Sequence, residues 1–209
     1  MPDRFHPAIR LLHWTMALLI VAMLFVGVAM ISTAGPAYAS LIAVHRPLGI
    51  AILLLAAIRL AVRLATGAPP LPADLPRVQQ RAARGAHILL YLAMIGLPLI
   101  GWAMLSAGGY PVRLTAALTL PPILPQDALA YGLLRQAHGL IAFAFFALIL
   151  GHLTIALIHG FVHRDGVFET MGFARTPVRR PEPQVPEPGV PEAQEPDEPD
   201  AEPDETPAS

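Results

Sequence analysis

Residues 136–160 read QAHGLIAFAFFALILGHLTIALIHG. In this apolar run, thirteen residues without a charged side chain separate His138 from His152. About 20 apolar residues in a helix span the hydrocarbon core of a bilayer. His138 and His152 are fourteen residues apart, which places them ~21 Å apart on nearly the same helix face. Because an ionisable side chain inside a membrane helix is costly, it indicates a function by default. The segment therefore predicts a transmembrane helix that presents two histidines to a helix bundle, one near each leaflet.

Three more apolar segments precede this one, and together they define the fold class. They lie at about residues 11–33, 41–64 and 85–105, and the fourth span is about residues 136–160. Only 14% of the 209 residues are charged and 55% are hydrophobic, whereas soluble domains have about 25% charged residues. We therefore predict an all-α fold for residues 1–175, a four-helix transmembrane bundle surrounded by membrane lipid. No nucleic-acid partner is expected.

The C-terminal residues have a different composition. Residues 176–209 contain ten acidic residues and ten prolines, with almost no large apolar side chain. Such a segment cannot bury enough apolar surface to offset the entropy lost on ordering. We predict a disordered, acidic, proline-rich tail on the cytoplasmic side.

The arginines predict the orientation of the bundle, since all 14 basic residues are arginine. Cytoplasmic connections carry the excess of positive charge in membrane proteins. One side of the predicted membrane has only three arginines: Arg46, Arg113 and Arg135. The other eleven flank the opposite ends of the spans, so both termini are expected in the cytoplasm. Arg59 and Arg63 are expected to extend from the inner end of the second span toward the interface.

The first span has a competing interpretation as a secretory signal peptide, because Ala37-Tyr38-Ala39-Ser40 resembles an A-x-A cleavage site. The apolar run before it is longer than the ~7–15 residues of a signal peptide. A histidine and a tryptophan at its entrance, His13 and Trp14, also fit a signal peptide poorly. We therefore favour a membrane-spanning helix.

The histidines predict the cofactor. His45 begins the second span on the outer side, level with His138, and His13 begins the first span on the inner side, near the level of His152. Two imidazoles that face each other across a bundle provide the two axial ligands of a haem iron. Without cysteine the chain cannot attach haem covalently. We therefore expect two haem b, with His13 and His152 as iron ligands of the inner haem and His45 and His138 as iron ligands of the outer haem. His87 is the alternative inner ligand.

A second group of side chains lies at the predicted cytoplasmic mouth. Arg77, His87 and His159 could form a proton-delivering pocket for a quinone head group. The alternative is an interfacial cluster that faces lipid phosphates. His6 and His163 lie outside the spans, and we assign them no role.

Several glycines lie within the spans near the histidines. They would let a flat macrocycle approach the backbone, or they would serve ordinary close packing of membrane helices. The sequence leaves both interpretations open for Gly49, Gly96, Gly101, Gly139 and Gly151.

Taken together, these motifs resemble the prokaryotic cytochrome b561 family over residues 5–173. No single motif is specific, but their combination is. The resemblance depends on Leu12-His13-Trp14, His45 with Gly49, Ile58-Arg59-Leu60-Ala61-Val62-Arg63-Leu64 before Ala68-Pro69-Pro70, Ala86-His87 with Tyr91, Leu97-Pro98-Leu99-Ile100-Gly101, His138, and His152 with His159.

The resemblance implies a di-haem protein of the bacterial inner membrane that takes part in respiratory electron transport. It implies the same four axial histidines, and a quinone site at Arg77, His87 and His159. It also implies that the chain acts as a superoxide oxidase, which passes electrons from superoxide at the periplasmic face to ubiquinone.

On this interpretation Arg46, Arg113 and Arg135 would form a positive funnel that attracts superoxide. They would otherwise contact haem propionates or lipid phosphates. Two other functions remain open. The chain could be a haem b membrane-anchor and electron-transfer subunit of a separate redox partner protein, or a membrane scaffold without haem.

Overall fold

The computed structural model describes residues 5–67, 76–115, 117–164 and 168–172. Its chain divides into two units, Met1–Thr176 and Pro177–Ser209. The second unit, and with it the predicted acidic tail, lies outside the described residues. The first unit contains four long helices, α1 (Pro7–Ser32), α2 (Pro36–Thr66), α3 (Arg77–Ala107) and α4 (Ala128–Leu157), and α4 continues into a π-helical turn, η1 (Ile158–His163). All four are long and apolar enough to cross a membrane, which confirms the predicted all-α, four-helix transmembrane fold.

The helices begin before the apolar runs, where local sequence signals start them. At α4 the Asp127 side chain accepts a hydrogen bond from the backbone N–H of Ala130 at 2.8 Å, an N-cap that satisfies an otherwise free helix donor. Pro7 and Pro36 stand in the first turns of α1 and α2, where the N–H that proline lacks would have no partner. As a result α4 starts eight residues before the apolar run that predicts it.

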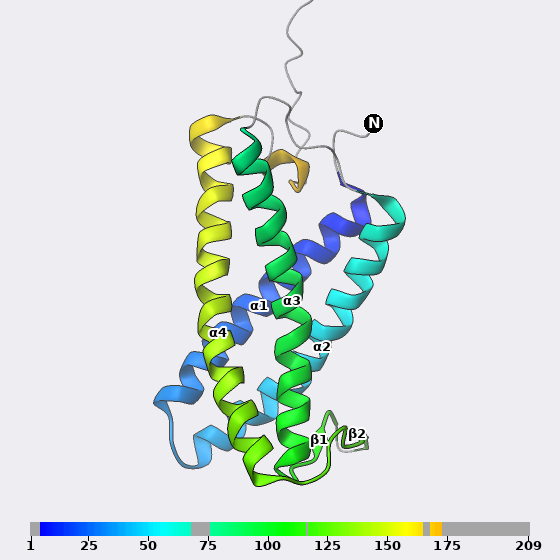
Figure 1. Cartoon of the computed structure of the whole chain (residues 1–209), viewed down its shortest axis with the longest axis vertical. Helices are drawn as coiled ribbons and strands as arrows, with labels where there is room; N and C mark the ends of the chain where they lie inside the picture. Colours follow the sequence, from blue (N-terminus) through cyan, green and yellow to red (C-terminus); the bar gives the residue numbers. More distant parts are fainter. Residues whose placement is uncertain (1–4, 68–75, 116, 165–167, 173–209) are drawn as a thin grey trace, which may run out of the picture. The chain divides into compact units, whose positions relative to one another are not determined.

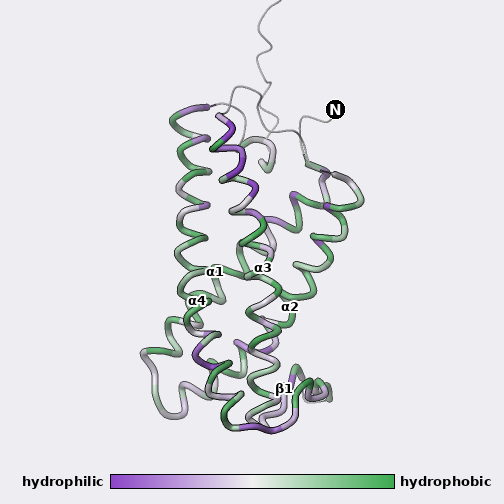
Figure 2. Tube along the Cα trace, viewed as in Figure 1, coloured by the Kyte–Doolittle hydropathy of each residue, from purple (hydrophilic) through white to green (hydrophobic). Residues whose placement is uncertain are grey.

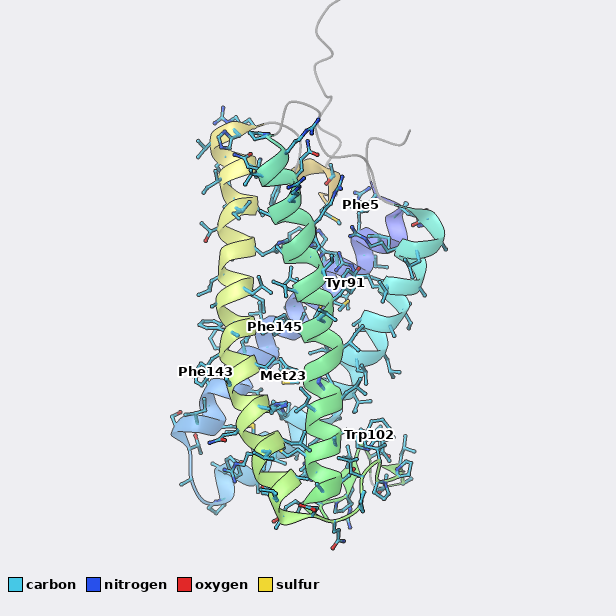
Figure 3. All side chains as sticks on the ribbon, in the orientation of Figure 1. Phe5, Met23, Tyr91, Trp102, Phe143 and Phe145 are labelled. Carbon is cyan, nitrogen blue, oxygen red and sulfur yellow. The ribbon has the colours of Figure 1, made fainter. Side chains whose placement is uncertain are left out.

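The helices pack in chain order. Among the described residues, close backbone packing joins α1 to α2, α2 to α3, and α3 to α4 (Figure 1). Neither α1 nor α2 packs closely along α4. A small apolar cluster lies between the helices midway along them, and Figure 3 shows its Phe145 between the ribbons. Its buried members are Met16, Ile20, Ile52, Ala56, Met94 and Phe145.

The outer surface of the bundle is apolar. Many large hydrophobic side chains are exposed, among them Leu18, Phe25 and Leu140, each more than 70% exposed. Figure 2 shows hydrophobic colour along most of each helix and hydrophilic colour at the start of α3. Exposed apolar side chains of this extent fit a surface in contact with lipid.

At one end of the bundle the α3–α4 connection forms a small hairpin. Its strands β1 (Val112–Arg113) and β2 (Thr119–Leu120) are antiparallel, with Val112 opposite Leu120. Trp102 donates from Nε1 to the Pro121 carbonyl at 2.9 Å, and Val112 is buried against the helices. The hairpin therefore lies fixed against the ends of α2 and α3.

At the other end the two described ends of the chain meet. The indole of Trp14 donates to the Met171 carbonyl at 3.0 Å, and the Phe5 N–H donates to the Thr170 carbonyl at 3.4 Å. These bonds attach the short 3-10 helix η2 (Phe168–Thr170) to the start of α1. Both described ends of the chain therefore lie on the same side of the four spans.

Candidate haem site

The outer pair of predicted ligands lies together. His45 is in the third turn of α2, and His138 lies at a similar depth in α4. The centres of their rings are 6.2 Å apart. A histidine nitrogen binds a metal at ~2 Å, and the centre of its ring lies roughly 1 Å further from the metal. Two imidazoles on opposite sides of one metal therefore have ring centres about 6 Å apart. The separation therefore fits two axial ligands of one iron.

The surroundings of the outer pair also suit a bound group. The Nδ1 atom of His45 is buried and has no hydrogen-bond partner, whereas the ring of His138 interacts with the backbone of Leu97 on α3. A Cβ atom on Gly101 would lie 3.3 Å from Cε1 and 3.5 Å from Nδ1 of His138. Buried polar atoms normally have partners, so the ring of His45 fits a site that binds a further group. Gly101 leaves the space in which the His138 ring lies against α3.

At the opposite end three histidines gather instead of two. The ring centres of His87 and His152 are 5.6 Å apart. His13, whose ring contacts that of Trp14 at 5.6 Å, interacts electrostatically with both of them. The structure thus brings both the predicted ligand His13 and the alternative His87 to the level of His152.

The two histidine levels are separated by the apolar cluster of the core. Phe145 lies seven residues from both His138 and His152, which is ~10 Å along the helix in each direction. Met94 occupies a similar middle position in α3, and both side chains are buried. Buried apolar side chains therefore lie between the two histidine levels.

Arg59 corrects one expectation from the sequence. It does not extend to the interface, because its side chain is only 8% exposed and its Nε atom is buried without a hydrogen-bond partner. It interacts electrostatically with His13, His87 and His152. A periodicity in the sequence could have revealed this placement, because Arg59 follows His45 by fourteen residues and so lies near the same face of α2.

The three quinone-site candidates lie on different elements or at different depths of the inner end, Arg77 and His87 on α3 and His159 on η1. Arg77 is exposed at the first residue of α3, and ten residues separate it from His87, a rise of ~15 Å. His159 lies in η1, where its ring contacts His163 at 5.4 Å. Of the three, the structure places His87 nearest the inner histidines.

The three outer arginines differ in their surroundings. Arg46 is half-buried and donates from Nη1 to the Pro111 carbonyl at 3.3 Å. Arg113 is exposed on β1, and Arg135 is exposed in the second turn of α4. All three lie at the end of the bundle that holds His45 and His138, two of them open to solvent or lipid headgroups.

Comparison with known proteins identifies the family of the chain. The family model of prokaryotic cytochrome b561 matches residues 4–174. The chain belongs to this family. It is 25% identical over 173 residues to cytochrome b561 homolog 2 of Escherichia coli (strain K12), covering 81% of this chain and 92% of that protein. It is 26% identical over 172 residues to cytochrome b561 homolog 1 of the same organism, covering 81% and 97%.

Membership of the cytochrome b561 family confirms several expectations. The chain is a multi-pass protein of the bacterial inner membrane, and it takes part in haem-based transmembrane electron transfer. The family binds haem b, and the paired rings of His45 and His138 fit that cofactor. The predictions of two haems, of individual axial ligands, and of superoxide and ubiquinone as substrates go beyond this evidence.

Proposed function

We propose that the chain holds two haem b, one at each histidine level, and conducts electrons between the two membrane faces. His45 and His138 would hold the outer haem. The observation that supports this most directly is the 6.2 Å separation of their ring centres, reached from two helices that do not pack closely along each other. When bound, haem supplies one-electron chemistry, and the protein provides its position, axial ligands and surroundings.

At the inner level we propose His13 and His152 as the axial ligands. A macrocycle between two ligands needs helices whose backbones stand apart, and α1 and α4 meet this requirement because they do not pack closely. By contrast, His87 and His152 come from α3 and α4, which pack along their length. His87 is then a neighbour of the inner site, placed to hold or move a proton.

We further propose that the protein is a superoxide:ubiquinone oxidoreductase. The resemblance to superoxide oxidases of this family suggests the substrates, and the positive side chains of Arg46, Arg113 and Arg135 at the outer end support an anionic one. Two superoxide anions would each give up one electron and leave as dioxygen. One ubiquinone would accept both electrons and two protons near His87 and His159. Both termini then lie in the cytoplasm and the outer haem lies at the periplasmic side.

A second candidate is a haem b subunit that anchors a separate redox partner protein and exchanges electrons with it. The exposed start of α3, with Arg77, Arg81 and Arg84, favours this candidate because it offers a charged surface at the inner mouth. The two functions differ in whether the single chain works alone.

The experiment that tests the proposal uses the purified full chain in liposomes with a ubiquinone analogue and an external source of superoxide. Haem reduction and quinone reduction are followed by absorbance, with superoxide dismutase added as a control. The proposal expects both signals from this chain alone, and expects dismutase to abolish both. Haem that stays oxidised under superoxide would contradict it and favour the partner-dependent subunit.

A further inference from the structure

Arg59 is a buried cation that has no carboxylate partner among the residues that the structure describes. Its side chain is 8% exposed, and its Nε has no hydrogen-bond partner. The guanidinium carbon lies 5.6 Å from the centre of the Tyr91 ring. The hydroxyl of Tyr91 is also buried without a partner, and Figure 3 shows this side chain beside α3. A buried charge of this kind is strongly destabilising unless it is paired.

The spans cannot supply a carboxylate to pair with Arg59. Residues 5–67, 76–126 and 128–164 contain no aspartate or glutamate. Arg59 is also seven residues before the end of α2 at Thr66, ~10 Å inside the helix end. The electrostatic partners of Arg59 among the described residues are Tyr91 and Arg63, and no carboxylate is among them. The anion is therefore expected from a bound molecule.

The position of Arg59 indicates which molecule this is. It interacts electrostatically with His13, His87 and His152, the three histidines of the inner level. Haem b has two propionate carboxylates. We propose that Arg59, supported by the hydroxyl of Tyr91, binds a propionate of the haem held at this level. The inference rests on the proposed inner haem site, but not on superoxide or quinone as substrates.

Other anions fit this position less well. A lipid phosphate offers the same anionic oxygens, yet it stays at the membrane surface, where it can reach Arg63 more readily than Arg59. Arg63 lies one turn nearer the helix end, less buried, with its guanidinium carbon 5.6 Å from the centre of the Phe5 ring. Arg63 is therefore a matched control, because it has the same charge on the same helix but lies nearer the surface.

The pairing would also affect the inner haem's redox potential. Oxidised haem iron carries one more positive charge than reduced iron, so a nearby positive charge favours the reduced form. If Arg59 is replaced by a neutral residue, the propionate keeps its negative charge and the oxidised form gains stability. The midpoint potential of the inner haem should therefore fall, and that of the outer haem, at the other histidine level, should not.

The first test uses the unmodified chain, produced without haem and then titrated with haem b or with haem dimethyl ester, which lacks the propionate charges. Filling of the inner site is followed by its low-spin spectrum. The ester should bind the inner site about tenfold more weakly or worse, as expected for the loss of a charge-assisted hydrogen bond. Equal binding of haem and ester would overturn the proposal without any variant.

The second test compares Arg59→Gln, Arg59→Lys, Tyr91→Phe and Arg63→Gln. In Arg59→Gln the preference for haem over its ester should largely disappear, and the inner midpoint potential should fall in a potentiometric titration. Arg59→Lys should keep most of the midpoint potential of the inner haem, because it keeps the positive charge. Tyr91→Phe should lose part of the preference for haem over its ester. Arg63→Gln should keep the preference for haem over its ester, and its inner midpoint potential should fall less than that of Arg59→Gln, because Arg63 also interacts electrostatically with His87.

The failure of this inference can be distinguished from failure of the haem site itself. If Arg59→Gln keeps the preference for haem over its ester, or if Arg63→Gln lowers the potential equally, the inner haem exists but Arg59 does not bind its propionate. If the unmodified chain binds no haem at the inner level, the proposed haem site is itself wrong.

Discussion

Gly101 gives the sharpest test of the outer haem site, because the structure defines what a larger side chain would meet. In Gly101→Ala the new Cβ would lie 3.3 Å from Cε1 and 3.5 Å from Nδ1 of His138. Carbon atoms pack best at ~3.5–4.0 Å, so the ring must move by a few tenths of an ångström. In Gly101→Leu the ring would have to leave its place against α3.

The expected magnitude follows from this crowding. Inserting a methyl group into a well-packed site typically costs ~1–3 kcal/mol. If His138 is an axial ligand, this strain is relieved when the haem leaves, so it weakens haem binding. A loss of this size corresponds to ~5- to 150-fold weaker binding at the outer site. Gly101→Leu should lose the outer haem altogether, while the inner haem stays.

The assay is a haem titration of the detergent-solubilised chain, with the two haems distinguished by reduced-minus-oxidised spectra. Gly85→Ala is the matched control, because it makes the same replacement in the same helix and its Cβ would meet nothing within 4 Å. The control should bind both haems as the unmodified chain does. If Gly101→Leu keeps two haems with unchanged spectra, His138 does not hold a haem in this position.

Three other predictions concern the remaining regions. Deleting residues 176–209 should change neither haem content nor thermal stability, since they lack apolar anchors; a lower melting temperature would show that they pack on the core. Arg113→Glu should slow superoxide-driven haem reduction without loss of haem, and the rate should fall with salt as the Debye length shrinks from ~10 Å at 0.1 M to ~3 Å at 1 M; a salt-independent rate would exclude the funnel. His159→Ala should slow quinone reduction in stopped-flow while haem reduction persists, and equal loss of both steps would indicate a structural role.

The sequence alone predicts the fold and much of the site, because both depend on helix periodicity. Four apolar runs predict four spans, and the fourteen-residue spacing of His138 and His152 predicts two levels on one face. The placement of His45 beside His138 follows from antiparallel threading of helices, which leaves little freedom in depth. The apolar runs, the histidine spacing and the depth of each span depend on short stretches of sequence, so they can be predicted without knowing how the helices pack.

Other features depend on packing and could not be predicted in the same way. The strands around Val112 are two residues long and lie against α2 and α3, so no local pattern predicts them. That His87 lies beside His152 depends on which helices pack together. Arg59 looked like an interfacial residue because it is near a span end, although its spacing from His45 already placed it on the inward face.

The central claim is that paired histidines at two levels hold two haems. The most direct measurement is the haem-to-protein ratio of the purified chain and of His138→Ala and His13→Ala, with His163→Ala as a control. The account predicts two haems in the unmodified chain and in the control, and one in each of the other variants, lost from the outer and the inner site respectively. An unmodified chain with fewer than two haems, or a His138→Ala variant that keeps both, would contradict it.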